Sequence, residues 1–422
     1  MEKLNYFLRL AYKNLSRHKL RTFVSIIAIA FAVMIVIFAR GFIYGMINSF
    51  YNDHIQYNSG HVKIVDKDYQ LEGRILSLTE TVEGYNDTSL EGFIQELENI
   101  ENVQTVIPRI KFGSITTTED ELINMIGWGV MPQKELKETN IERQITKGRM
   151  VEQGNMEIVM GTLLLDELNR EVGDKVTLVF NNSFNSFNGA TFKIVGEIRS
   201  ELKMLNEKLF YLPIDQAQRL LIMNGQVTEL LLFSNQRQNA NKITPLISNL
   251  LADKGLLDKY TVISYMESGG LMGWLEMAKA VYNFIYIFLV VLASFVVINT
   301  MIMIVNERTK EIGMMSALGL EKRDILYLFL VEGALMGGLG SFIGAVLGGI
   351  LTNIINRIGI SFGSLTEGFS SDLLFGGTIY PVFSIGNIIF GFILGLIIVT
   401  IACVIPARRA AKMEPNDALR EI

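Results

Sequence analysis

Four stretches of the chain are apolar over a length that suits a membrane. They are residues 22–39, which continue past Arg40 to residue 47, and residues 280–306, 325–356 and 385–405. A helix needs about 20 mostly apolar residues to cross the hydrocarbon core. Lipid cannot hydrogen-bond to the backbone, so a single spanning segment has to satisfy its backbone hydrogen bonds within a helix. The pattern therefore predicts four transmembrane helices, the third of which contains Glu332.

Composition supports this interpretation. Half of the 422 residues are hydrophobic and 19% are charged, whereas soluble domains usually carry about a quarter charged residues. The single cysteine, Cys403, lies in an apolar run, so neither an internal disulfide nor a cysteine metal cluster is possible. The three histidines lack metal-site or triad spacing, and HExxH does not occur. We predict no catalytic, metal-binding or cofactor-binding residues.

Lysine and arginine gather in three segments. These precede the first apolar stretch, separate the second from the third, and follow the fourth. Basic loops stay in the cytoplasm, so both termini are expected there, in a bacterial cytoplasmic (inner) membrane. Residues 50–276 instead hold 21 Lys and Arg against 32 Asp and Glu, and residues 357–383 contain only Arg357 of the basic types. Both segments are expected on the outer side.

Residues 50–276 show the pattern of a mixed α/β domain. Short β-branched runs at residues 61–65 and 193–198 predict strands, and the spacing of apolar residues at 89–100 predicts a helix. Residues 156–180 indicate a strand, a helix, a turn and a strand, and residues 208–221 a strand followed by a helix. Residues 180–190 are expected to form a mobile hairpin tip. The predicted fold class is thus all-α in the membrane, with a large α/β extracytoplasmic domain between the first two spans.

Two segments at the cytoplasmic surface have helical patterns. In residues 1–21, one face collects the apolar residues Leu4, Phe7, Leu8, Ala11 and Leu15, which predicts an interfacial elbow helix. A basic flank that only sets topology is the alternative. In residues 307–324, Ile312, Met315 and Leu318 share a face, and Gly319 predicts the end of a short helix. An ordinary charged loop is the alternative there.

Small residues and isolated charges mark the spans. Glycines recur every four residues in the third and fourth spans, at Gly340, Gly344, Gly348, Gly391 and Gly395. This spacing predicts close packing between helices, and glycines that face lipid are the alternative. Glu332 is expected to form a structural hydrogen bond rather than a proton or substrate site. Arg40 is expected to extend toward the headgroups.

An energy source for transport is missing from this sequence. The phosphate-binding pattern GxxxxGK[ST] does not occur, so ATP is not expected to bind this chain. Basic residues lie beside the spans and form no groove with aromatic residues, so nucleic acid is not an expected partner.

The chain resembles the permeases of the lipoprotein-releasing, macrolide-exporter and cell-division ABC systems, also called type VII or mechanotransmission transporters. The motifs that carry the resemblance are LAYKNLSRHKLRT before the first span, NERTKEIGMMSALG between the second and third, the EG at Glu332 with the following glycines, and PARRAAKMEPNDAL from Pro406. IVMGTLLLDELNREVGDKVTL and LFYLPIDQAQRLL are similar in the outer domain. The resemblance covers nearly the whole chain.

The resemblance implies that a coupling helix between the second and third spans docks in a groove of a separate ATPase. Its residues would be Glu307, Arg308, Lys310, Glu311, Ile312, Gly313, Met315, Leu318 and Gly319. Two ATPase subunits, which bind ATP and Mg²⁺, would act with two permeases, identical or paralogous. Their closure would move the spans, and stalks on the first two spans would pass that motion to the outer domain.

Within the family, the lipoprotein-releasing branch is the closest in pattern. NSGHVKI at residues 58–64 follows a long first span as in that branch, and the chain begins with its elbow helix, whereas macrolide exporters begin with an ATPase. This implies release of lipoproteins to a periplasmic carrier. Two alternatives are an efflux permease for drugs or peptides with a periplasmic adaptor, and a non-transporting regulator of a cell-wall hydrolase. The expected segments are 1–21, 22–49, 50–276, 277–306, 307–324, 325–356, 357–383, 384–406 and 407–422.

Overall fold

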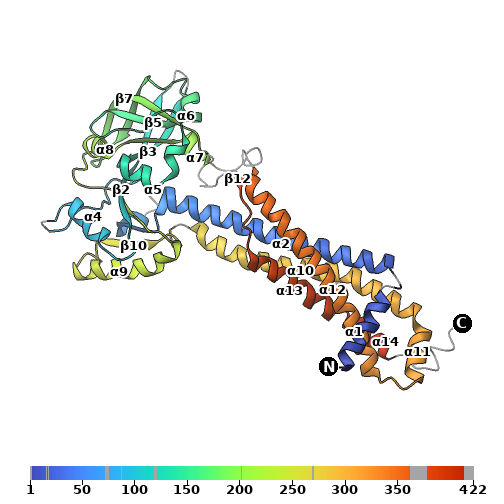
Figure 1. Ribbon diagram of the computed structural model, residues 1–422. Coiled ribbons are helices and arrows are strands. Elements are labelled where there is room, and N and C mark those ends of the chain that lie inside the picture. The colour runs from blue at the N-terminus through green and yellow to red at the C-terminus, as the bar shows by residue number, and fades with distance from the viewer. Residues whose placement is uncertain are drawn as a thin grey trace. The chain divides into compact units, whose positions relative to one another are not determined.

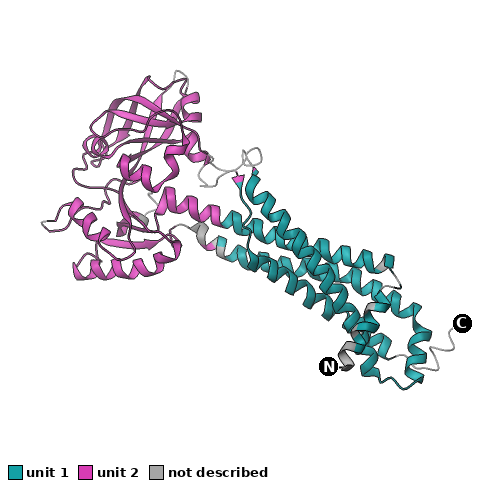
Figure 2. Ribbon diagram, in the orientation of Figure 1, with its two compact units in different colours: residues 1–47, 275–360, 379–422 teal, residues 48–274, 361–378 magenta. Residues whose placement is uncertain are grey.

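The computed structural model describes residues 2–15, 17, 19–71, 76–86, 88–117, 121–200, 202–268, 270–361 and 378–412. The chain forms two compact units (Figure 2). Unit 1 comprises Met1–Ile47, Leu275–Ile360 and Ile379–Ile422, and unit 2 comprises Asn48–Trp274 and Ser361–Thr378. The outer domain, expected at residues 50–276, therefore corresponds to unit 2, which also takes in Ser361–Thr378.

Unit 1 is built from helices (Figure 1). They are α1 (Glu2–Leu15), α2 (Lys19–His54), α10 (Gly270–Glu307), α11 (Thr309–Ala317), α12 (Lys322–Ile358), α13 (Ile385–Ala402) and α14 (Val404–Ala411). Both α2 and α10 cross the division between the units. Within the described residues, four helical segments are long and apolar enough to span a membrane: Thr22–Ser59, Met277–Glu307, Lys322–Ile358 and Ile385–Ala411. The membrane part of the predicted fold class is confirmed.

Glycines line the contacts among α2, α12 and α13. A Cβ added at Gly340 would lie 2.8 Å from Cβ of Ile29, and one at Gly348 would lie 3.0 Å from Cβ of Ile37; at Gly344 the nearest atoms are backbone atoms of Ala30. The predicted glycines of α13 lie at the same place, where Gly391 meets the Ile37 side chain and Gly395 meets Ser341 and Val33. Such close approach matters in lipid, where packing has to replace the hydrophobic drive between helices.

The elbow helix α1 packs against α12 instead of presenting its whole apolar face to a membrane surface. Phe7 and Ala11 are buried against Leu328, and the Phe7 ring lies 6.2 Å from the Tyr327 ring. The side chains of Leu4 and Leu8 lie outside the described set. The Phe7 and Ala11 part of the apolar face predicted for this helix is thus occupied by α12.

The last described helix, α14, replaces the first part of the expected tail. It begins two residues before Pro406, a position within the first turn of a helix where a missing N–H is tolerated. Ala407 and Ala410 are fully buried in the same apolar cluster as Ile312 and Phe329. Residues 413–422 of the expected tail lie outside the described residues.

Unit 2 contains a mixed sheet with helices around it, which confirms the α/β part of the predicted fold class. Its strands are β1 (Val62–Asp66), β2 (Thr105–Thr117), β3 (Leu122–Val130), β4 (Ile145–Gly148), β5 (Glu157–Gly161), β6 (Lys175–Asn181), β7 (Phe187–Ile198), β8 (Leu209–Pro213), β9 (Glu229–Phe233) and β10 (Tyr260–Ser264). Its helices, besides the ends of α2 and α10, are α3 (Lys67–Leu71), α4 (Leu90–Glu98), α5 (Pro132–Glu138), α6 (Thr162–Glu167), α7 (Lys203–Glu207), α8 (Ile214–Leu221) and α9 (Ala240–Asp253). A short pair, β11 (Ile360–Ser361) and β12 (Thr378–Ile379), lies where the two units divide.

Six strands of the sheet close into a ring. The strand order is β10-β1-β9-β2-β3-β8-β5-β7-β4, and β6 pairs with both β7 and β2. Because β6 joins the two, β2, β3, β8, β5, β7 and β6 form a barrel, which leaves fewer exposed strand edges. Phe112 packs edge to face on Phe180 and on Phe210, with ring centroids 5.8 Å apart in each pair. The β6–β2 contact is short, with only Ser114↔Phe180 and Ile115↔Val179 in register.

The local predictions for unit 2 hold at element level. The strands expected at 61–65 and 193–198 are β1 and part of β7, and the helix expected at 89–100 is α4, whose first turn is capped by Ser89. The units expected at 156–180 and 208–221 are β5-α6-β6 and β8-α8. The hairpin expected at 180–190 has a loop of only residues 182–186, because Asn182 Oδ1 accepts hydrogen bonds from the backbone N–H groups of Phe184 and Ser186 and tightens the turn.

A buried charged cluster holds the end of α2 on the sheet of unit 2. Arg109 and Glu135 form an ion pair of 2.6 Å with both side chains fully buried, and a second Arg109 nitrogen donates to the carbonyl oxygen of Tyr57 at 2.8 Å. Tyr57 lies in the π-helical turn Ile55–Ser59 that continues α2. The Arg109 guanidinium also lies 4.4 Å from the Trp128 ring centroid. A buried pair with several additional partners is costly to break on one side only.

His61 makes the stability of unit 2 dependent on pH. Its Nδ1 accepts a hydrogen bond from the backbone N–H of Ser234 at 3.2 Å, so protonation of that nitrogen would remove the bond. Burial, with a smaller contribution from Arg237, lowers the pKa of His61 to about 4. Because the pKa is lower in the folded protein than in the unfolded chain, this stability is present above about pH 6.5 and is lost as pH falls toward 4.

We predict that lowering the pH from 7 to 5 reduces local stability around β1 and β9 by up to about 2 kcal/mol. Hydrogen exchange of these strands in the purified full-length protein, corrected for intrinsic rates, measures the effect. In the variant His61→Gln the change between pH 7 and 5 should shrink by that amount. An unchanged pH dependence in the variant would show that another group is responsible.

Candidate coupling site

Helix α11 is a separate short helix because the chain breaks on both sides of it. Arg308 leaves the helical conformation (φ −100°, ψ 13°) between α10 and α11. At the other end, Gly319 has φ +96°, a conformation that glycine adopts without strain. The N–H of Gly319 donates to Ser316 and the N–H of Leu320 donates to Met315, each at 3.1 Å, which is the Schellman pattern of a helix end. The helix therefore ends beside the predicted Gly319.

One side of α11 is anchored in unit 1. Ile312 is fully buried in the apolar cluster that contains Phe329 and Ala407, Gly313 is buried, and Met315 packs against the cluster. Leu318, predicted on the same face, is 84% exposed. It occupies the end of the helix, where the turn toward Gly319 directs it away from the cluster. The predicted three-residue apolar face is thus correct for two residues and wrong for Leu318.

Charged and amide side chains link α11 to its neighbours. Arg308 donates from Nη1 to Glu332 Oε1 at 3.2 Å and from Nε to Glu311 Oε2 at 2.9 Å. Asn14 of α1 donates to the same Glu332 oxygen at 2.5 Å, and Arg17 pairs with Glu311. We call these five residues the junction network. It connects α1, the start of α11 and the N-terminal part of α12.

The central pair of the junction network is removed from water. Arg308 is 6% exposed and Glu332 is 1% exposed, so each charge depends on the other for compensation. The hydrogen bond expected for Glu332 is thus present, with Asn14 and Arg308 as its partners. At the rim, partial burial acts to raise the pKa of Glu311, but hydrogen bonds from Arg308 and Arg17 outweigh it, so this pKa lies below its ordinary value. Glu311 is therefore charged at neutral pH.

The opposite side of α11 faces away from unit 1. Lys310, Met314, Leu318 and Gly319 are exposed there, and we call them the coupling face. Glu307, the last residue of α10, is exposed as well. A short helix that combines apolar knobs with charges at its margins suits a groove on another protein. Of the predicted coupling residues, Glu307, Lys310, Leu318 and Gly319 are accessible, whereas Arg308, Ile312 and Gly313 are buried.

Sequence reasoning missed three contributors to this site. Asn14 and Arg17 were assigned to the elbow segment, and Met314 was not assigned at all. The sequence did contain a signal for Asn14 and Arg17. A carboxylate near the membrane surface needs hydrogen-bond donors, and the segment before the first span supplies them. The exposure of Met314 depends on the exact rotation of α11, which apolar spacing in a nine-residue helix does not fix.

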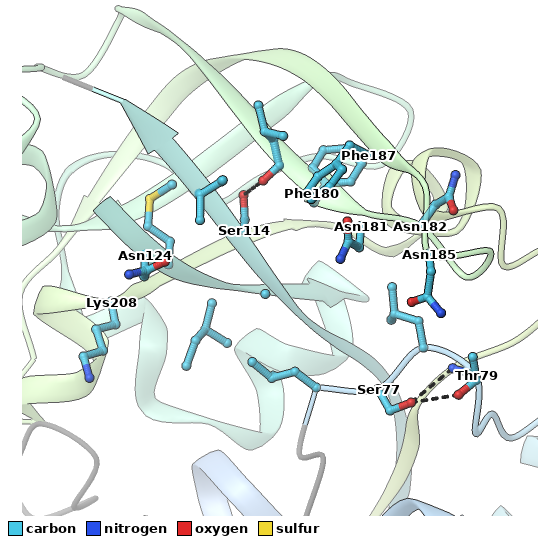
Figure 3. Close-up of a pocket in the computed structure, with 17 residues that line it drawn as sticks. Ser77, Thr79, Ser114, Asn124, Phe180, Asn181, Asn182, Asn185, Phe187 and Lys208 are labelled. Atoms are coloured by element: carbon cyan, nitrogen blue, oxygen red, sulfur yellow. Dashed lines mark hydrogen bonds between the residues drawn. The ribbon is translucent and has the colours of Figure 1, made fainter. Parts of the chain in front are cut away.

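An open pocket of about 790 Å³ lies in unit 2, lined by β2, β3, β6 and residues 76–79 (Figure 3). Asn181, Asn182 and Asn185 lie at one end, and Asn124 and Lys208 at the other. Lys208 is the only charged residue among the described residues that line it. Apolar side chains and asparagine amides make up most of that lining, so the pocket offers contacts to a polar, partly apolar ligand. Within the described residues, no three His, Cys, Asp or Glu side chains form a metal-binding group.

Two family models match this chain, one in each part of it. Residues 283–415 match the family described as FtsX-like permease C-terminal, and residues 22–243 match the MacB-like periplasmic core domain. The chain is 24% identical to the lipoprotein-releasing system transmembrane protein LolC of Neisseria meningitidis serogroup B, over 83% of this chain and 87% of that protein. It is 23% identical to an uncharacterized ABC transporter permease of Methanocaldococcus jannaschii, over 99% and 98% of the two chains. It is 23% identical to the macrolide export ATP-binding/permease protein MacB of Haemophilus ducreyi, over 97% of this chain and 55% of that protein.

The junction network predicts a particular pattern of stability in single and double variants. Arg308→Met alone leaves Glu332 buried without its cation, and Glu332→Met alone leaves Arg308 buried without its anion. Each should destabilise unit 1 by about 3–5 kcal/mol, because an unpaired buried charge keeps its desolvation cost. The double variant places two apolar side chains together and should recover most of the loss. Thermal unfolding of the purified chain in detergent measures all three.

Arg323→Met is the matched control, since Arg323 is exposed at the start of α12. It should unfold at the temperature of the wild type. If the double variant instead lost the sum of the two single effects, the two residues would not be acting as a pair.

Proposed function

Because this chain belongs to the family of ABC permeases with a MacB-like periplasmic core domain and an FtsX-like permease C-terminal region, we propose that it is the permease through which a separate ATPase drives release of lipoproteins to a periplasmic carrier. The observation that carries the proposal is similarity to a lipoprotein-releasing transmembrane protein along 87% of that protein's length. The complex would contain two ATPase subunits, which bind ATP and Mg²⁺, and a second permease, identical or paralogous.

The coupling face is the proposed ATPase contact. Its residues are exposed, so this side of α11 is accessible to a groove on the ATPase. Ile312 and Arg308 hold the other side of α11 against unit 1. Force applied to the coupling face would therefore act on α12 through the Arg308–Glu332 pair and on α1 through Asn14. A mobile loop would absorb such a displacement, whereas this anchored helix transmits it.

Substrate is proposed to move on the outer side of the membrane and not through the bundle. Around α2, α12 and α13 the glycine contacts bring backbone and side chains into close packing. The basic segments support an orientation with both termini in the cytoplasm and unit 2 in the periplasm of a bacterial inner membrane. The pocket of unit 2, whose described lining is mainly apolar and amide side chains, would offer contact to an apolar segment of substrate or carrier.

An efflux permease with a periplasmic adaptor is the second candidate, favoured by the match of residues 22–243 to the MacB-like core domain. Depletion of the protein in its own host separates the two. Lipoprotein release predicts that outer-membrane lipoproteins accumulate in the inner membrane, as measured by membrane fractionation. Correct lipoprotein sorting together with increased drug sensitivity would reject lipoprotein release in favour of efflux.

Coupling is tested at the exposed residues of α11. Leu318→Asp should reduce co-purification of the ATPase subunit at least tenfold, because it puts a charge in the proposed groove contact. Its effect on thermal stability should be small, since the side chain is 84% exposed. Leu122→Asp, at another exposed leucine in unit 2, is the control and should leave ATPase binding unchanged. Normal ATPase binding by Leu318→Asp would contradict docking at this face.

Charge reversal at Glu311, suggested by the sequence alone, is a less selective probe. Glu311→Lys would still be expected to weaken ATPase association or to uncouple hydrolysis from transport. Because Glu311 contacts Arg17 and Arg308, the change also places three cations together and loosens α1 from α11.

A further inference from the structure

Arg40 is a cation at the far end of a membrane span. It follows Thr22, the first residue of the apolar stretch, by 18 positions on one continuous helix, which corresponds to about 27 Å of helix length. The hydrocarbon core is about 30 Å thick, so Arg40 lies at the level where the core meets the headgroups of the opposite leaflet. A positive charge at this depth requires an anionic or strongly polar partner.

The Arg40 side chain lies across aromatic rings, a contact that the expected extension toward the headgroups did not include. Its guanidinium carbon lies 3.6 Å from the ring centroid of Phe390 on α13 and 5.5 Å from that of Tyr44, one turn further along α2. This stacking fixes the guanidinium in one place. Its cation–π attraction is smaller than the cost of an isolated charge in lipid.

The described residues leave part of this cation without a partner. Nε and Nη1 of Arg40 are buried and have no hydrogen-bond partner among the described residues. Tyr44, the second ring beside Arg40, also lines a narrow crevice with Lys279, Tyr282 and Asn283 of α10. The two buried nitrogens of Arg40 can only donate hydrogen bonds, so this site favours an anionic group.

The surroundings indicate what kind of anion. Ile389 and Ile393, which flank Phe390 on α13, are exposed and apolar, as are Val281 and Phe284 on α10. A ligand here has to combine a negative group with apolar chains. Guanidinium groups bind phosphate oxygens through charge-assisted hydrogen bonds, often two at once. We propose that Arg40, stacked on Phe390, binds the phosphate of a phospholipid whose acyl chains lie along α10 and α13.

The test uses the full-length protein, delipidated in neutral detergent. Phosphatidylglycerol, a diacylglycerol with the same acyl chains and inorganic phosphate are added separately, and bound lipid is measured by native mass spectrometry together with the unfolding temperature. Only phosphatidylglycerol should be retained and raise the unfolding temperature. Arg40→Gln should weaken its apparent affinity at least tenfold, and Arg40→Lys, which keeps the charge but not the planar stack, should have an intermediate effect.

Arg357→Gln is the control, because Arg357 is an exposed arginine in the last turn of α12. It should bind phosphatidylglycerol like the wild type, and the folded state of each variant is checked by circular dichroism. Equal lipid binding by wild type and Arg40→Gln would overturn the proposal. A diacylglycerol effect as large as that of phosphatidylglycerol, or an equal effect of inorganic phosphate, would also overturn it. So would loss of self-association in Arg40→Gln without loss of lipid, which would assign the counter-ion to a second permease.

Discussion

The buried pair of Arg308 and Glu332 is the interaction on which the α1–α11–α12 end of unit 1 depends. Two charges that are almost completely removed from water can persist only if their attraction and hydrogen bonds offset the loss of hydration. Asn14 supplies an additional donor to Glu332, and Arg308 uses a second nitrogen for Glu311. Since these partners come from α1, α11 and α12, the electrostatic requirement of one carboxylate fixes the relative positions of three helices.

Within the spans, close packing fixes the relative positions of the helices. In lipid, separating two apolar helices exposes no surface to water, so helices associate through close contact and polar bonds instead. The glycines of α12 allow the backbone of α2 to approach, and those of α13 admit Ile37 and Ser341. Larger residues at Gly340 or Gly344 would meet Ile29 or the backbone of Ala30 and push the helices apart. The polar junction at one end and the glycine contact along the bundle therefore restrict the same helix, α12, in two different ways.

The fold class was predictable from sequence because long apolar runs, basic flanks and strand patterns each have a strong periodic or compositional signal. The short coupling helix was predictable from Gly319 and from the charges on both sides. The direction of the Leu318 side chain was not predictable, because Leu318 directly follows the last residue of this nine-residue helix, where helical spacing no longer fixes direction. The partners of Glu332 were not identified either, since Asn14 and Arg308 are 318 and 24 residues away in the chain and no local pattern connects them. The closed barrel of unit 2 depends on two residue pairs between β6 and β2, which strand propensity cannot specify.

A continuous helix makes these separate restraints mechanically relevant. In unit 1, α11 is joined to α12 by a buried ion pair, and α12 contacts α2 through its glycines. Helix α2 then runs without interruption to His54, and in unit 2 the turn that follows it is held by Arg109 through the carbonyl oxygen of Tyr57. Each of these contacts is either a buried hydrogen bond to a charged group or close packing at a glycine. Neither kind of contact deforms gradually under force. A displacement at α11 is therefore more readily accommodated by movement of whole helices than by local deformation, which is the property that a permease driven by an external ATPase requires.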